Sequence, residues 1–181
     1  MKIASITPQV LFLIILGVNL GCVKDELQKG EAFAFSSFKN SESKFDAKFV
    51  DGDRPNSISL RLTHYSDNGY LNIIQIANAP KTNDTTYLTH FDEIPSMPID
   101  TFRAEFFVQL DEDVIGDYYV VDTVHSNADS YIILSDFSAR KVTGSFQINF
   151  VLDPEITWIK FDESIPDTFN IRNGRFSAEQ Y

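Results

Sequence analysis

The chain has 181 residues, 43% of them hydrophobic, and a formal net charge of −11. So acidic a surface repels phosphate backbones, which argues against a nucleic-acid partner. With a single cysteine there is no internal disulfide, so packing has to stabilise the fold.

An apolar run near the start of the chain ends at the only cysteine, Cys22. Its hydrophobic core, Val10 to Leu16, is too short for a membrane span, which takes about 20 apolar residues, and Asn19 interrupts it. The pattern is typical of a secretory signal with cleavage before the cysteine. We therefore expect residues 1–21 to be a signal peptide, the alternative being a buried strand or helix. Removing them also removes Lys2, which leaves a mature chain with a net charge of −12.

Residues 20–26 resemble the sorting signals of bacterial lipoproteins. Leu20-Gly21-Cys22 is similar to the end of a lipobox, and Cys22-Val23-Lys24-Asp25-Glu26 resembles the export signal of surface lipoproteins in the Bacteroidota. The resemblance implies that Cys22 is lipidated and that Lys24, Asp25 and Glu26 direct export. It also implies an outer-membrane anchor and exposure at the cell surface. Stable attachment to a membrane needs more than one acyl chain, and a lipidated cysteine carries two or three. A solvated charge cluster is the alternative interpretation of the three charged residues.

After the lipidation site, residues 22–43 are predicted to be a tether and residues 44–181 to be one all-β domain. The tether is polar overall, and the length of the chain is that of a single domain. Phe33, Phe35 and Phe38 indicate that a first strand lies within the tether.

Apolar and polar residues alternate through most of the remaining chain, as in half-buried strands. Asn68-Gly69 is a hairpin signal between two of these strands, and Asn78 to Asp100, with Pro80, Pro95 and Pro98, is expected to be a long loop or irregular edge. The expected strands cover residues 45–49, 58–62, 71–77, 87–91, 102–110, 118–124, 131–134, 142–152, 156–161 and 168–176. A turn is expected at residues 111–116.

No helical period persists, so the expected fold is an antiparallel β-sandwich of about eight to ten strands, with a closed lipocalin-like β-barrel as the alternative. Val142 to Phe146 and Phe169 to Phe176 are similar to the end of uncharacterised lipoprotein domains in the Bacteroidota, which implies architecture and location but no activity. Gly144 is expected to let a neighbouring backbone or ring approach, and Gly174 to permit a bulge or a positive φ.

No catalytic, cofactor-binding or metal-binding residues are predicted. His64, His90 and His125 lack metal-ligand spacing, and no Gly-x-Ser-x-Gly motif occurs. The acidic turns at Asp51-Gly52-Asp53 and Asp111-Glu112-Asp113 lack the spacing of an EF-hand, and calcium binding there stays open.

These observations favour a non-catalytic binding or adhesion module for an extracellular glycan or protein, presented on loops such as residues 78–100. A carrier of a small apolar ligand is the alternative, because the 16 Phe and 7 Tyr residues can line a cavity or fill a solid core. A hydrolase would need converging acids that the sequence does not single out.

Overall fold

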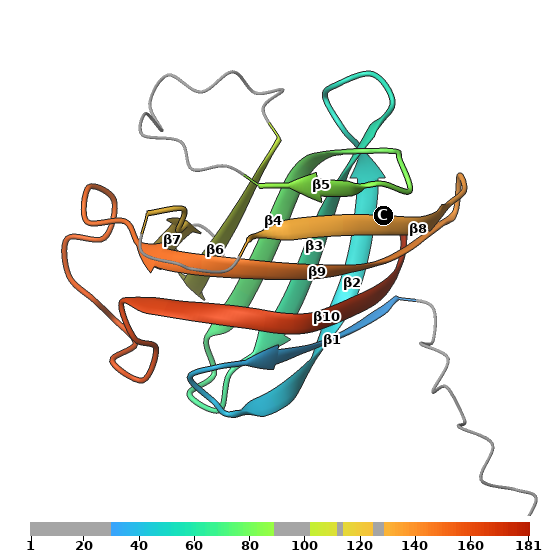
Figure 1. The fold of residues 1–181 in the computed structure, drawn as a ribbon. Helices are drawn as coiled ribbons and strands as arrows, with labels where there is room; N and C mark the ends of the chain where they lie inside the picture. The colour runs from blue at the N-terminus through green and yellow to red at the C-terminus, as the bar shows by residue number, and fades with distance from the viewer. Residues whose placement is uncertain (1–29, 89–101, 112–113, 125–128) are drawn as a thin grey trace, which may run out of the picture.

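The computed structural model describes residues 30–88, 102–111, 114–124 and 129–181 (Figure 1). These residues form ten strands and no helix, which confirms the predicted all-β class. None of them forms an apolar helix of the length that a bilayer requires. The strands are β1 (Glu31–Ser36), β2 (Ser41–Asp51), β3 (Ser57–Tyr65), β4 (Leu71–Pro80), β5 (Thr85–Tyr87), β6 (Arg103–Asp111), β7 (Val114–Val121), β8 (Tyr131–Phe137), β9 (Lys141–Leu152) and β10 (Thr168–Gln180).

The strands form one sheet that closes into a ring. Their order is β1-β10-β2-β3-β4-β6-β7-β9-β8-β5, with additional pairings of β1 with β2 and of β10 with β9. The end of β10 pairs in parallel with β2, at Glu179–Lys48 and Gln180–Phe49, whereas the other pairings are antiparallel. In Figure 1, β8, β9 and β10 cross in front of β2, β3 and β4, so the ring has two layers with crossing strands, as in a sandwich whose strands pass from one layer to the other.

Alternation along the strands separates the core from the surface, as predicted. On β3, Ile58, Leu60 and Leu62 are fully buried, whereas Arg61 between them is exposed. On β6, Phe106 faces the interior between two other buried residues. Because side chains alternate with a period of two, each strand gives one face to the interior of the ring.

Aromatic rings fill the centre of the ring. Phe169 lies 5.1 Å from Phe38, 5.1 Å from Phe106, 5.2 Å from Tyr119 and 5.3 Å from Phe150, measured between ring centroids. Three of these contacts are edge-on, the arrangement that the ring quadrupole favours. Around Phe169, aromatic rings therefore contact one another and do not surround a ligand cavity.

Two glycines allow aromatic rings to pack against β9 and β10. A Cβ atom at Gly144 would collide with the backbone carbonyl of Ile133 and lie 2.8 Å from the ring of Phe176. A Cβ atom at Gly174 would lie 2.6 Å from the ring of Phe146. The predicted close approach at Gly144 is confirmed. At Gly174 the predicted bulge is present, and the positive φ belongs to its neighbour, the asparagine at 173.

The sheet begins at Glu31 rather than at residue 44, so part of the predicted tether belongs to the fold. β1 pairs with both β2 and β10, and Ala32 and Ala34 are its buried residues. The aromatic side chain of Phe33 lies on the other face, beneath the cations of Lys44 and Arg175. The first strand predicted within the tether is therefore confirmed, but small alanines rather than Phe33 and Phe35 provide its inward face.

Other boundaries also differ from the prediction. β7 begins at Val114 and ends at Val121, so Gly116 lies in a strand and not in a turn. β5 covers Thr85–Tyr87, and the rest of the expected strand at 87–91 lies largely outside the described residues, as does most of the candidate loop at 78–100. The predicted hairpin at Asn68-Gly69 is confirmed, with Gly69 at φ +83°.

Candidate functional site

The connection between β9 and β10, residues 153–167, exposes a group of large apolar side chains. Ile156, Trp158, Ile159 and Phe161 are 41%, 88%, 74% and 51% exposed. We call this connection the apolar loop. Single exposed apolar residues are ordinary, but several within one short segment are typical of an interaction site.

Hydrogen bonds fasten the apolar loop to the outer edge of β7. This strand pairs with β9 only through Tyr119–Val121, which leaves the edge at Tyr118 for the loop. The backbone N–H of Asp153 donates to the carbonyl of Tyr118 (2.9 Å), and the Tyr118 N–H donates to Oγ1 of Thr157 (2.9 Å). The loop therefore satisfies strand-edge groups that another strand would otherwise have to pair.

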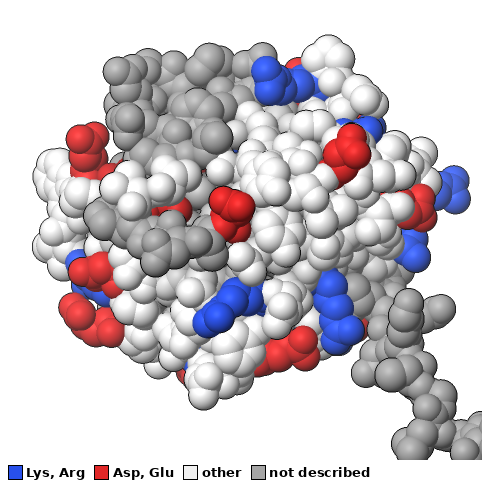
Figure 2. Space-filling view, viewed as in Figure 1, with Lys and Arg blue, Asp and Glu red and all other residues white. Residues whose placement is uncertain are grey.

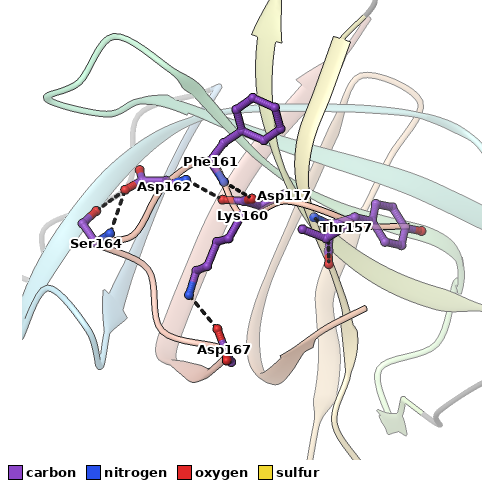
Figure 3. A network of polar contacts seen from close by, with 8 residues as sticks. Asp117, Thr157, Lys160, Phe161, Asp162, Ser164 and Asp167 are labelled. Carbon is purple, nitrogen blue, oxygen red and sulfur yellow. Dashed lines mark hydrogen bonds and ion pairs between the residues drawn. The ribbon is translucent and has the colours of Figure 1, made fainter. Parts of the chain in front are cut away.

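A buried carboxylate holds the far side of the loop. Asp117 on β7 is fully buried, and its two oxygens accept hydrogen bonds from the backbone N–H groups of Phe161 (2.7 Å) and Asp162 (2.9 Å). Figure 3 shows the Asp117 side chain reaching these two consecutive residues. Hydrogen bonds to a charged acceptor are stronger than neutral ones, so Asp117 fixes the backbone that carries Phe161.

Tight turns shape the rest of the apolar loop. Oδ1 of Asp153 accepts from the N–H groups of Glu155 (2.8 Å) and Ile156 (3.3 Å), and the Thr157 N–H donates to the Asp153 carbonyl (2.9 Å). Nε1 of Trp158 donates to the carbonyl of Glu155 (2.9 Å). The strand predicted at 156–161 is therefore wrong, because the aspartate side chain captures backbone donors that a strand would present to a neighbour.

The end of the loop is held in the same way. Oδ1 of Asp162 accepts from the Ser164 N–H (3.0 Å) and hydroxyl, and Nζ of Lys160 pairs with Oδ1 of Asp167 (2.7 Å), as Figure 3 shows. The apolar side chains are thus presented on a backbone that is fixed before any partner arrives. Such preorganisation lowers the entropic cost of binding.

Carboxylates surround the apolar side chains. Residues 153–167 hold five acidic residues and one lysine, a net charge of −4. In Figure 2, acidic side chains predominate along the left margin, where Figure 1 has the loop. Beneath the loop, burial raises the pKa of the Tyr119 hydroxyl above its ordinary value of 10.0, and Asp117, Asp167 and Asp162 add to the shift. An anionic partner would therefore be repelled.

Comparison of the chain with known proteins found no relative. The chain matches no family model, no curated protein sequence and no solved structure.

The residues predicted for lipidation and export, Cys22, Lys24, Asp25 and Glu26, lie outside the described residues. So do His90, His125 and most of the acidic turn at 111–113.

The other candidate ligands have ordinary partners. Nδ1 of His64 lies 2.9 Å from the carbonyl oxygen of Lys44, and Asp51 pairs with Lys81 at 2.9 Å. Among the residues that the structure describes, no three His, Cys, Asp or Glu side chains come together as a metal-binding group.

A hollow of about 830 Å³ lies on the outer face of β2 and β3. Its lining carries both signs of charge, and Lys48 already pairs with Glu179 across it. The apolar loop is the stronger candidate because it combines exposed apolar side chains with a fixed backbone. The sequence contains one signal for it, the only tryptophan of the chain, four residues after Pro154.

Proposed function

We propose that this chain is a bacterial surface lipoprotein of the Bacteroidota type, and that its all-β domain is a non-catalytic binding module. Cys22 carries the lipid anchor in the outer membrane, and Lys24, Asp25 and Glu26 direct the protein to the cell surface. The apolar loop is the element that meets the partner, an extracellular glycan or protein.

The observation that carries the binding role is the exposure of Ile156, Trp158, Ile159 and Phe161 on a loop pinned by a buried carboxylate. Exposed apolar side chains lower solubility, yet the hydrogen bonds to Asp117 hold the loop in the conformation that exposes them. Tryptophan is also the residue type most enriched among side chains that dominate binding energy.

The position of the loop fits an anchored protein. Figure 1 has the apolar loop on one side of the molecule and the start of β1 on the other. Seven residues separate Cys22 from Gly30, and the eight steps between the two residues span at most about 28 Å. An anchor at Cys22 therefore holds the β1 side near the bilayer and leaves the loop free to face outward.

Replacing Trp158 by alanine is expected to weaken binding about 30-fold, which corresponds to about 2 kcal/mol, without unfolding the domain. The side chain is 88% exposed, so its removal leaves no cavity. The chain from residue 23 onward, which holds all ten strands, is screened against arrays of oligosaccharides and extracellular-matrix proteins. Because Trp158 is the only tryptophan, a blue shift of its fluorescence reports contact at the loop.

Tyr87→Ala is the matched control, since this aromatic side chain is 58% exposed on the edge strand β5. It should bind as the wild type does. Equal binding by the Trp158→Ala variant, or no binding of the wild type across both arrays, would refute the proposed role of the loop.

The anchor has a separate test. Cys22→Ser is expected to carry no acyl chains and to be lost from the outer membrane, because the residue that holds the lipid is removed. Fractionation and intact-mass measurement check this. The triple alanine variant of Lys24, Asp25 and Glu26 should stay in membranes but lose labelling by an impermeant surface probe. Outer-membrane partition of Cys22→Ser would contradict the anchor, and equal labelling of the triple variant would contradict the export signal.

A further inference from the structure

We infer that a polar pocket beside the apolar loop binds one neutral sugar unit. This inference rests on the proposed function, because it names the class of partner. The pocket has a volume of about 190 Å³. It lies where three connections meet: the segment after β1, the turn between β3 and β4, and the end of the apolar loop. Asn72 at the start of β4 also lines it.

The pocket has the size of a small ligand. Its volume corresponds to about six water molecules at about 30 Å³ each and is below the range of about 300 to 1,000 Å³ for drug-sized ligands. A single hydroxyl-rich ring matches this space better than an extended lipid or peptide. The rest of a longer glycan would then lie outside the pocket.

One buried polar atom of the pocket lining, Oδ1 of Asn72, lacks a partner among the residues that the structure describes. The Asn72 side chain is only 3% exposed. A buried polar atom without a partner destabilises a protein, so such atoms point to a bound molecule. Oδ1 is a hydrogen-bond acceptor, and a sugar hydroxyl can donate to it.

The charges in the pocket favour a neutral ligand. The carboxylates of Asp67 and Asp162 in the lining oppose an anion, and the ammonium group of Lys39 in the same lining opposes a cation. A hydroxyl group both donates and accepts, so it can pair with a carboxylate and with an ammonium group alike. Asp162 is 4% exposed and held in place through its N–H to Asp117, so this acceptor is preorganised.

Two apolar side chains complete the pocket. Ile165 is almost fully buried, and the ring of Phe38 packs edge-on against Phe169. A sugar ring has a C–H face as well as hydroxyl edges, and this apolar wall suits that face. The pocket and the apolar loop share residues 162–165, so one glycan chain can occupy the pocket and continue over the loop.

The test uses the chain from residue 23 onward with D-glucose, D-galactose, D-mannose and N-acetyl-D-glucosamine as probes. Saturation-transfer NMR should detect millimolar binding of at least one of them, with a shift of the Asn72 side-chain amide signal. In Asn72→Leu, which fills the site with an apolar group of similar size, affinity should fall at least tenfold. Lys39→Ala, at a half-buried surface position where folding is not at risk, should also weaken binding.

Ser177→Ala is the matched control. The substitution removes a buried hydroxyl that has no partner among the described residues and that lies on β10, outside the pocket lining. This variant should therefore bind the sugar as the wild type does. No transfer with any probe, or equal transfer in Asn72→Leu, would overturn the inference. A response of the Asn72 signal to Ca²⁺ and not to sugar would overturn it as well. Polymer binding through Trp158 without any monosaccharide binding would remove the pocket and leave the proposed function intact.

Discussion

Replacing Phe169 by alanine is expected to lower the free energy of unfolding by about 3 to 5 kcal/mol. The side chain is 6% exposed, and its ring contacts Phe38, Phe106, Tyr119 and Phe150 at centroid distances of 5.1 to 5.3 Å. Truncation would leave a cavity between both layers, and the four neighbouring rings cannot close it without moving from their packed positions. Chemical denaturation measures the change, and the melting temperature should fall by about 6 to 20 °C.

Phe169→Leu serves as the control for this prediction. Leucine restores most of the lost volume but none of the aromatic contacts, so its cost should be clearly smaller than that of alanine. Costs below about 1 kcal/mol for both variants would mean that the rings do not form a packed centre. In that case the interior would have room for a small apolar ligand, as the carrier alternative requires.

Replacing Asp117 by alanine is expected to cost about 2 to 4 kcal/mol, because the N–H groups of Phe161 and Asp162 both lose their acceptor. Asp117 is fully buried, so water cannot replace the carboxylate without opening the edge of β7. The variant should also bind its partner more weakly, although Asp117 itself is not part of the surface. Denaturation and binding are measured on the same preparation.

Asp117→Asn keeps one oxygen acceptor and should recover roughly half of the lost stability. Its amide group adds donors that the site does not need, so full recovery is not expected. If Asp117→Ala lost neither stability nor binding, the loop would be held by its internal turns alone. Preorganisation by β7 would then be the wrong account of the site.

Alternation of apolar and polar residues was sufficient to predict most of the sheet, because strand geometry forces successive side chains to opposite faces. The stretch from Val142 to Leu152 became β9 with bounds within one residue of the prediction. The first strand was harder to delimit, since its inward residues are Ala32 and Ala34 rather than large apolar side chains. The closure of the sheet was not predictable, because it depends on a pairing of β10 with β2 that leaves no local pattern.

The candidate site was mispredicted for a physical reason that can be named. Ile156 to Phe161 have the composition of a strand, but the hydrogen-bond acceptors that decide their conformation are Asp153 nearby and Asp117 on another strand. A local pattern contains the first of these and not the second. The pocket at Asn72 is a still clearer case, since its walls come from four separate parts of the chain.

For the export proposed above, the place of β1 in the sheet has a consequence. β1 pairs with its neighbour β2, but Ala32 also pairs with Phe176, near the opposite end of the sequence, so the first strand gains its second partner only after the rest of the domain has been synthesised. Folding that depends on contacts so distant in sequence is slow. A precursor that has to thread through a translocation channel benefits from this delay, because it stays unfolded long enough to pass. The topology itself would then keep the nascent chain competent for secretion.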